Sequence, residues 1–194
     1  IEMKALTDTQ YIRQLVSEGE HCHQDFKFEI SDARKIARSL SAFANTEGGR
    51  LLIGVKDNGK IAGVRSDEEI YMIEAAATMY CKPKVELETQ TYKVEGKTVL
   101  EIRINETVSK PVYALDETNK PWAYIRIKDE NILATPVHLK MWQHSKKPEG
   151  ALVTFTEREQ RLLDVLKEKL SLNQCCKLCR LNHKTTCELL ADFI

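Results

Sequence analysis

The order of apolar and polar positions changes near residue 145, from mixed helical and strand-like patterns to helical patterns alone. The clearest helix is predicted over 32–45, where apolar side chains recur at helical spacing after Ser31, a suitable N-cap residue. Turn sequences at 57–59 and 95–97 predict hairpins. Strands joined mostly by hairpins, with helices between some of them, predict an α+β fold with a mixed, mostly antiparallel sheet. The strands are expected at 22–29, 51–55, 60–64, 85–94, 98–104 and 122–127.

The change of pattern also predicts two domains. An α+β domain is expected over 1–145, and the polar stretch 146–154, which contains proline and glycine, is typical of a linker. Three short helices with a tight turn at Leu181-Asn182 are predicted for 155–194, the arrangement of a helix-turn-helix. Capping boxes at Thr156–Glu159 and Ser171–Gln174 predict the starts of the first two helices. Because the sequence stops on apolar helical residues, we expect the natural chain to continue and complete a winged-helix-like segment.

Composition indicates a globular chain without an overall attraction for charged partners. The 194 residues are 42% hydrophobic, and 29 basic residues balance 29 acidic ones. A nucleic-acid site must therefore come from a local patch of charge. No apolar run is long enough to span a bilayer, no signal peptide begins at Ile1, and the adjacent Cys175-Cys176 pair favours reduced thiols. We therefore expect a cytoplasmic protein without a membrane partner.

Acidic side chains near the first strand form a candidate metal site. Strand alternation places Asp25 and Lys27 on one charged face. Glu20 lies just ahead of this strand, and Asp57 ends a strand expected nearby. Carboxylates at Glu20, Asp25 and Asp57 would together hold Mg²⁺ or Mn²⁺, which activates water against a phosphodiester. The alternative is a solvated strand face with Asp57 as a turn residue, in which case no cofactor is expected.

Two groups of basic side chains are candidate contacts to nucleic-acid phosphates. Arg34, Lys35 and Arg38 share the exposed face of the predicted helix 32–45, where a phosphate-binding patch and an ordinary solvated face are equally good interpretations. The second group lies in the helix-turn-helix, whose second helix would enter the major groove of DNA. Its candidate contacts are the basic residues Lys177, Arg180 and Lys184, together with His183, Thr185 and Thr186 near the start of that second helix.

DNA is the partner that this C-terminal segment favours. Helix-turn-helix proteins bind two half-sites, so we also expect a homodimer. The alternative is a helical module that binds other proteins or another copy of itself.

Cysteine and glycine patterns raise two further ligand hypotheses. Metal-like spacing occurs at Cys176, Cys179, His183 and Cys187. These residues fall at inward positions of short helices, where free cysteine behaves as a small hydrophobic residue, so a core role is favoured over zinc. Gly48-Gly49 follows a helix, whereas a phosphate binds at a helix N-terminus, so a helix C-cap is favoured there.

Several short strings of residues together resemble one protein family. They are Gly19-Glu20, Asp25-Phe26-Lys27, Ser41-Ala42-Phe43-Ala44-Asn45-Thr46-Glu47-Gly48-Gly49, Leu52-Ile53-Gly54-Val55, Asp57-Asn58-Gly59, Lys110-Pro111-Val112 and Tyr124-Ile125-Arg126. Over residues 10–143 the chain resembles the Schlafen/AlbA-like domain family. The last segment is similar to the start of a winged helix.

The resemblance implies an α+β fold that binds nucleic acid, and with it a DNA-binding transcriptional regulator. Some Schlafen proteins are endoribonucleases that use two glutamates and a later aspartate, which correspond to Glu20, Asp25 and Asp57. The second position here is one methylene group shorter than glutamate, which favours binding over cleavage. A metal-dependent endoribonuclease acting on structured RNA, with Lys27 as a further catalytic residue, is the alternative.

Overall fold

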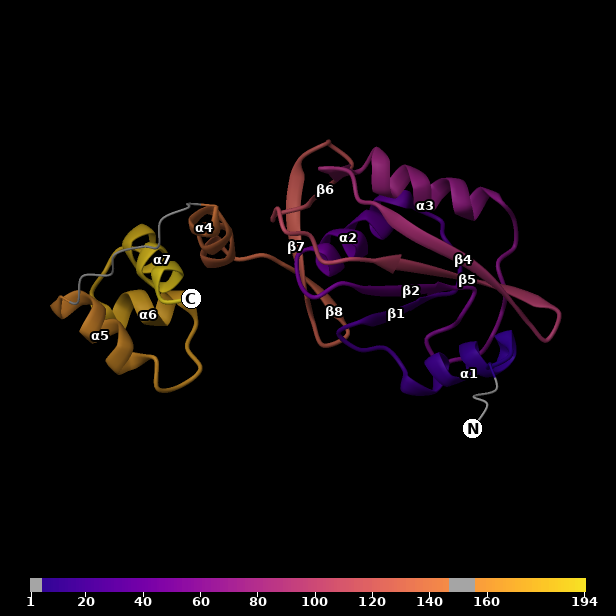
Figure 1. The fold of residues 1–194 in the computed structure, drawn as a ribbon. Helices are drawn as coiled ribbons and strands as arrows, with labels where there is room; N and C mark the ends of the chain where they lie inside the picture. Colours follow the sequence, from indigo (N-terminus) through magenta and orange to yellow (C-terminus); the bar gives the residue numbers. More distant parts are fainter. Residues whose placement is uncertain (1–4, 147–155) are drawn as a thin grey trace. The chain divides into compact units, whose positions relative to one another are not determined.

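A computed structural model describes residues 5–146 and 156–194 and divides the chain into two compact units, Ile1–Leu133 and Ala134–Ile194 (Figure 1). The division falls before the helix Pro136–Ser145, whereas the sequence pattern placed this helix in the first domain. The difference arises because the helix packs against the C-terminal helix of the second unit. The predicted linker, apart from its first residue, lies outside the described residues.

The first unit contains three helices and two four-stranded sheets, which confirms the α+β class. One sheet has the order β1-β2-β5-β4 and the other β3-β6-β7-β8, and only the β1–β2 pair is parallel. The elements are α1 (Asp8–Glu18), β1 (Gln24–Lys27), α2 (Ala33–Ala44), β2 (Gly49–Ile53), α3 (Glu68–Thr78), β3 (Cys81–Lys82), β4 (Leu87–Val94), β5 (Lys97–Ile104), β6 (Tyr113–Leu115), β7 (Pro121–Ile127) and β8 (Glu130–Leu133).

The return strand expected at 60–64 is reduced to a single bridge between Val55 and Ile61. The tight turn itself is present, because the Gly59 N–H donates to the Lys56 carbonyl at 2.8 Å. After Ile61 the chain leaves the ladder, and the Gly63 N–H donates to the Gly54 carbonyl at 2.9 Å. Tertiary contacts between these glycines therefore shorten the hairpin.

Helix α2 forms where the apolar spacing predicts it, but its N-cap is Asp32 instead of Ser31. The Asp32 carboxylate accepts from the Arg34 N–H at 2.9 Å, which satisfies a backbone donor at the start of the helix. The apolar stripe that includes Ile36, Leu40 and Phe43 is fully buried. Helical spacing thus identified the helix and its buried face correctly, and missed the cap by one residue.

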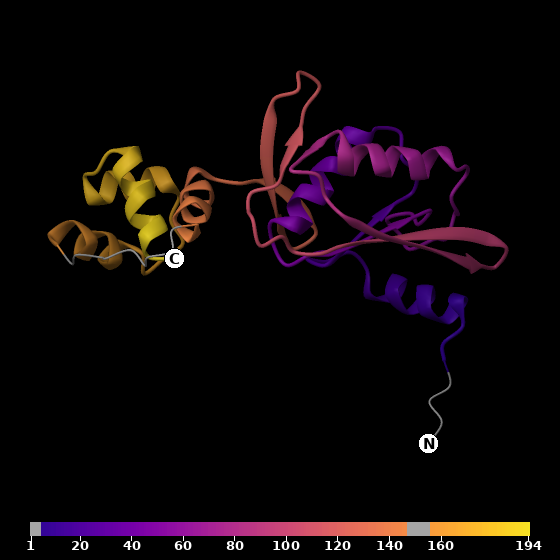
Figure 2. The same ribbon diagram turned by 45° about the horizontal axis from the view of Figure 1, so that its top comes forward.

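The first sheet lies between two apolar layers because side chains alternate along its strands. Leu51 and Ile102 belong to the cluster that packs under α2 and α3, whereas Leu52 and Val99 belong to the cluster covered by α1. Figures 1 and 2 show α1 on one side of this sheet and α2 with α3 on the other.

The C-terminal turn of α2 joins the helix to β6 and β7 through buried polar side chains. The Ser41 hydroxyl donates to the Val112 carbonyl and accepts from the Tyr124 N–H. The Asn45 amide donates to the carbonyls of Val112 and Tyr124. Ser41 and Asn45, which both belong to the Ser41–Gly49 string, therefore hold the second sheet on α2.

Gly48 and Gly49 end this string for two different steric reasons. Gly48 has a φ of +72°, the left-handed region that favours glycine, and this agrees with the expected helix end. At Gly49, a Cβ atom would lie 2.5 Å from the Phe43 ring and 2.9 Å from the His23 carbonyl. These positions need glycine for backbone geometry and close packing, without any phosphate ligand.

The second unit is all helical over its described residues. It contains α4 (Pro136–Ser145), α5 (Glu157–Val165), α6 (Leu172–Cys179) and α7 (His183–Asp192). Capping boxes at Thr156 and Ser171 begin α5 and α6 as the sequence predicts. A short connection in which Arg180 adopts the left-handed conformation joins α6 to α7.

In this unit α7 packs against α4 and α6, and α5 packs against α6. Leu162, Cys175, Cys179 and Leu189 form its buried apolar cluster. Helix α4 lies against α7, where His144 Nδ1 is 2.9 Å from Asp192 Oδ1.

Candidate nucleic-acid interface

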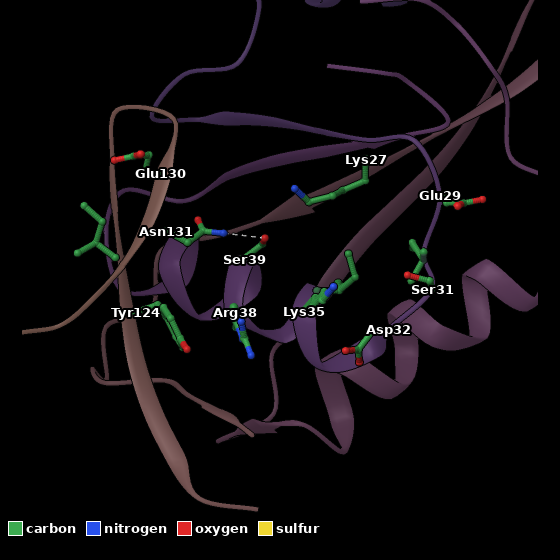
Figure 3. Close-up of a pocket in the computed structure, with 13 residues that line it drawn as sticks. Lys27, Glu29, Ser31, Asp32, Lys35, Arg38, Ser39, Tyr124, Glu130 and Asn131 are labelled. Carbon is green, nitrogen blue, oxygen red and sulfur yellow. Dashed lines mark hydrogen bonds between the residues drawn. The ribbon is translucent and has the colours of Figure 1, made fainter. Parts of the chain in front are cut away.

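A pocket of about 600 Å³ opens in the first unit where β1, α2 and β8 meet (Figure 3). Strand β1 and the loop after it supply one wall, the exposed side of α2 supplies the base, and β7 with β8 supply the opposite wall. Its lining residues are Lys27, Glu29, Ile30, Ser31, Asp32, Lys35, Ile36, Arg38, Ser39, Tyr124, Glu130, Asn131 and Ile132.

Three cationic side chains gather at this pocket although they come from two elements. Lys27 ends β1, while Lys35 and Arg38 lie one helical turn apart on α2. Arg38 is 3.9 Å from Glu117, and Lys35 is exposed with no ion pair among the described residues. The pocket therefore joins a residue predicted for catalysis to two residues predicted for nucleic-acid binding.

The pocket also contains three carboxylates, so its formal charge is balanced. Glu29 lies 2.9 Å from the Arg65 guanidinium, and Asp32 is occupied as the cap of α2. Among the described residues, Glu130 has neither an ion pair nor a side-chain hydrogen bond, and it is the pocket carboxylate left without a partner. The positive charge of Lys35 is consequently the least compensated in the pocket, and it is the one best able to attract a phosphate.

Lys27 is held in place by a buried carboxylate beneath it. Its ammonium group is 2.7 Å from Asp25 Oδ2, and the Asp25 side chain is only 5% exposed. On the other side, Asp25 Oδ1 lies 3.5 Å from the Arg126 guanidinium. Because its two oxygens face two different cations, the buried Asp25 carboxylate fixes the position of Lys27.

Arg126 links β7 to the segment before β1. Its side chain is 1% exposed and donates to the carbonyls of His21 and Gln24 and to Asn131 Oδ1. The guanidinium also lies 5.0 Å from the centre of the Phe43 ring. Because every direction around this cation is occupied by protein groups, Arg126 is a positioning residue rather than a ligand contact.

Glu20 and Asp25 come together as predicted, but Asp57 does not join them. Glu20 accepts from the Phe26 N–H at 2.9 Å, and partial burial followed by its hydrogen bond with Asp25 raises the pKa of Glu20. Asp57 is exposed in the turn after β2. Over the described part of the chain, no three histidine, cysteine or acidic side chains are arranged to hold a metal ion. The carboxylates thus fit a structural role better than a three-ligand Mg²⁺ or Mn²⁺ site.

Arg34 is the member of the predicted basic group that does not reach the pocket. Its guanidinium stacks 4.4 Å from the Tyr80 ring centre and donates to the Asp116 carbonyl at 3.2 Å. It therefore secures the loop after β6 and is not a free phosphate contact.

In the second unit, most of the predicted DNA contacts are exposed. Lys177, Arg180, His183 and Lys184 face solvent, and Thr185 is half-buried. Thr186 differs, because it is fully buried and its hydroxyl donates to the Asn182 carbonyl at 2.9 Å. Inward-facing Thr186 consequently has no surface to offer a base.

The cysteines behave as small core residues in this unit. All six cysteines of the chain are free, and burial raises the pKa of the Cys175, Cys179 and Cys187 thiols. His183 Nδ1 lies 3.7 Å from Cys187 Sγ, a contact one helical turn apart. The core interpretation of the spacing therefore holds for Cys179 and Cys187, whereas Cys176 is half-buried and His183 is exposed.

Sequence reasoning missed the residues that β8 contributes. Asn131 lines the pocket and joins Arg126 to Ser39, to which its amide donates at 2.9 Å (Figure 3). A four-residue strand with mixed polarity carries too little periodicity to be recognised. Tyr124 was noted only as part of a string, and its place in the pocket depends on the pairing of β7 with β8.

Comparison with protein-family models identifies residues 20–135 as Schlafen, AlbA_2. The chain belongs to this family. The match covers the first unit from Glu20 onward, including α2, the pocket and the Arg126 network, and it confirms the family expected from the strings of residues. Nucleic-acid binding is the broad function that this membership supports.

Comparison with solved structures finds similarity at low sequence identity. The DIP2311 protein from Corynebacterium diphtheriae aligns with 76% of this chain at 19% identity and a TM-score of 0.50. The chain spans 30% of that protein's length. The N-terminal domain of a RecG-related protein from Nitrosomonas europaea aligns with 63% of this chain and 88% of that domain, at 24% identity and a TM-score of 0.46.

No curated protein matches the chain significantly. Within residues 5–146 and 156–194, no helix combines the length and the apolar content needed to cross a membrane.

Proposed function

We propose that this Schlafen AlbA_2 protein binds nucleic acid through the pocket of its first unit and acts as a DNA-binding transcriptional regulator. The observation that carries the proposal is the place of Lys35, an exposed cation without an ion pair among the described residues, beside Lys27 and Arg38 in one pocket. A local cluster of cations is what a neutral protein requires to hold a phosphate backbone.

The second unit supports the DNA-reading part of the proposal. Lys177, Arg180 and Lys184 are exposed around the connection between α6 and α7, and this stretch carries no acidic residue before Glu188. In a helix-turn-helix, the first residues of the second helix reach base edges in the major groove. His183, Lys184 and Thr185 occupy that position on α7, whereas buried Thr186 does not.

Binding is favoured over metal-dependent hydrolysis because of how the carboxylates are engaged. Glu20 bonds to the backbone of β1, Asp25 is paired with Lys27 and Arg126, and Asp57 lies apart. Cleavage of structured RNA in Mn²⁺ by the wild-type protein, lost in Glu20→Gln, would support the endoribonuclease alternative instead.

Fluorescence anisotropy across a salt series tests the proposal with the full chain. Each phosphate contact releases counterions, so Lys35→Ala and Lys184→Ala should weaken DNA binding and each lower the salt slope by about one unit. The exposed lysines Lys84 and Lys167, outside both candidate surfaces, provide the control variants Lys84→Ala and Lys167→Ala. A flat salt response, or wild-type slopes in both test variants, would overturn the proposal.

A transcriptional regulator must also prefer particular sequences and bind them with the expected symmetry. Selection from a random duplex library should enrich one motif with two half-sites, and Lys184→Ala should reduce this preference. Light scattering with the enriched duplex should give the mass of two chains bound to one duplex. Unselective binding, or a single chain on the enriched duplex, would contradict the regulator and the dimer respectively.

A further inference from the structure

We propose that the pocket receives one unstacked nucleotide of a single-stranded nucleic acid, with its base against Tyr124 and its phosphate beside Lys27 and Lys35. This inference rests on the proposed function and specifies the form of nucleic acid that the first unit prefers. It follows from the pocket's size, from the different chemistry of its walls and from the rigidity of its polar groups.

The volume of about 600 Å³ lies within the range of pockets that enclose small organic ligands, about 300–1,000 Å³. A nucleotide fits this space only when its base has left the stack. In a duplex that step costs a few kcal/mol, whereas a single strand already exposes its bases. A concave site of this size thus favours single strands over duplexes, which present phosphates on a convex surface.

The walls divide into an apolar part and a cationic part, as a nucleotide requires. Tyr124 and Ile132 come from β7 and β8, and Ile30 and Ile36 extend the apolar lining. Lys27 and Lys35 lie between this side and the loop after β1 (Figure 3). A base can contact the aromatic and aliphatic side chains while its phosphate faces the ammonium groups.

Asn131 supplies a fixed polar group between these two parts. Its Oδ1 accepts from Arg126 and its amide donates one hydrogen to Ser39, which leaves the second amide hydrogen available to a ligand. Because Arg126 and Ser39 are almost completely buried, the orientation of Asn131 is set before any ligand arrives. Such preorganised donors bind a base edge without the entropy cost of ordering a side chain.

A second aromatic side chain allows the strand to continue beyond the pocket. Trp122 lies two residues before Tyr124 on β7, so alternation places both on the same face, about 7 Å apart along the strand. Trp122 is 36% exposed, its N–H is fixed by Asp116, and Lys120 lies 4.3 Å from its ring centre. An exposed aromatic ring beside a cation is a suitable platform for the next base and its phosphate.

The experiment compares labelled oligonucleotides of one sequence, which lacks the motif enriched in the duplex selection, as single-stranded DNA, single-stranded RNA and duplex DNA, using anisotropy with the full chain. At least one single-stranded form should bind several-fold more tightly than the duplex. Tyr124→Leu should weaken single-strand binding by between about 5-fold and 100-fold, while Tyr124→Phe keeps the ring and most of the affinity. Thermal unfolding of both variants shows whether the fold is retained. If Tyr124→Leu does not fold, Trp122→Leu serves as the test, and it should also weaken single-strand binding.

The outcomes separate this inference from the proposed function. If duplex DNA binds as tightly as both single strands, and folded Tyr124 and Trp122 variants keep wild-type affinity, the inference is overturned while the proposed function stands. If no nucleic acid binds, both are overturned. Competition by a free mononucleotide at the same concentration as the oligonucleotide would assign the pocket to a soluble nucleotide and also overturn the single-strand inference.

Discussion

The Asn45 carboxamide makes a two-way pair of hydrogen bonds with the backbone of Val112, which lies 67 residues further along the chain. Its Oδ1 accepts from the Val112 N–H at 2.7 Å, and its amide donates to the Val112 carbonyl at 2.9 Å. A third bond reaches the Tyr124 carbonyl at 2.9 Å. One buried side chain at the end of α2 thus fixes both β6 and the pocket-lining strand β7.

We expect Asn45→Ala to lower the free energy of unfolding by about 3 kcal/mol, since it leaves buried backbone groups of Val112 and Tyr124 without partners. Urea denaturation measures the change. The matched control is Asn58→Ala, because exposed Asn58 makes one bond to the Lys60 N–H and its loss leaves those groups open to water. Equal losses in the two variants would show that the Asn45 bonds do not hold the sheet.

Removal of the Arg126 guanidinium tests the buried network under Lys27. Arg126→Met keeps the apolar length of the side chain but leaves Asp25 with one cation. It also removes one donor from each of the His21 and Gln24 carbonyls and from Asn131 Oδ1. The loss of stability should be about 3–5 kcal/mol. The exposed pair between Arg13 and Glu95 offers the comparison, since Arg13→Met should cost about 1 kcal/mol or less. A small effect of Arg126→Met in urea denaturation would mean that Asp25 is not held by this cation.

The second unit should lose stability as the pH falls because of His138. Burial lowers the pKa of His138, and its unprotonated Nδ1 accepts from the Thr135 N–H at the start of α4. Above pH 6.5 this histidine is neutral in both the folded and the unfolded chain. Below that pH the unfolded chain takes up the proton first, so stability falls until the folded form is protonated as well.

The measurement uses Trp142, the buried tryptophan on the same helix, as the reporter in a Trp122→Phe background, which leaves it the only tryptophan of the chain. Urea transitions at pH 7.5 and pH 5.5 should differ in that background. Addition of His138→Gln should reduce the difference, since glutamine can accept the same Thr135 bond without titrating. An unchanged pH dependence in His138→Gln would assign the effect to another group, such as the His144–Asp192 pair.

The sequence by itself determined the features that depend on residues close together in the chain. Helical spacing located α2, and capping boxes located the starts of α5 and α6, because a helix face and its cap lie within a few residues. The longest string that carried the family resemblance contains Gly48, whose left-handed φ of +72° ends the short connection between α2 and β2.

Only the tertiary structure decided which charged groups form the site. The contact between Arg126 and the His21 carbonyl joins residues 105 positions apart, and no local pattern records such a pairing. Strand β2 does lie beside β1 as expected, but Asp57 follows β2 in an exposed turn and does not join Asp25. Asn131 lines the pocket from β8, a strand too short to show an alternation of apolar and polar residues. Sheet pairing is set by long-range burial and hydrogen bonding. The pocket therefore could not be predicted without the positions of the two sheets on α2.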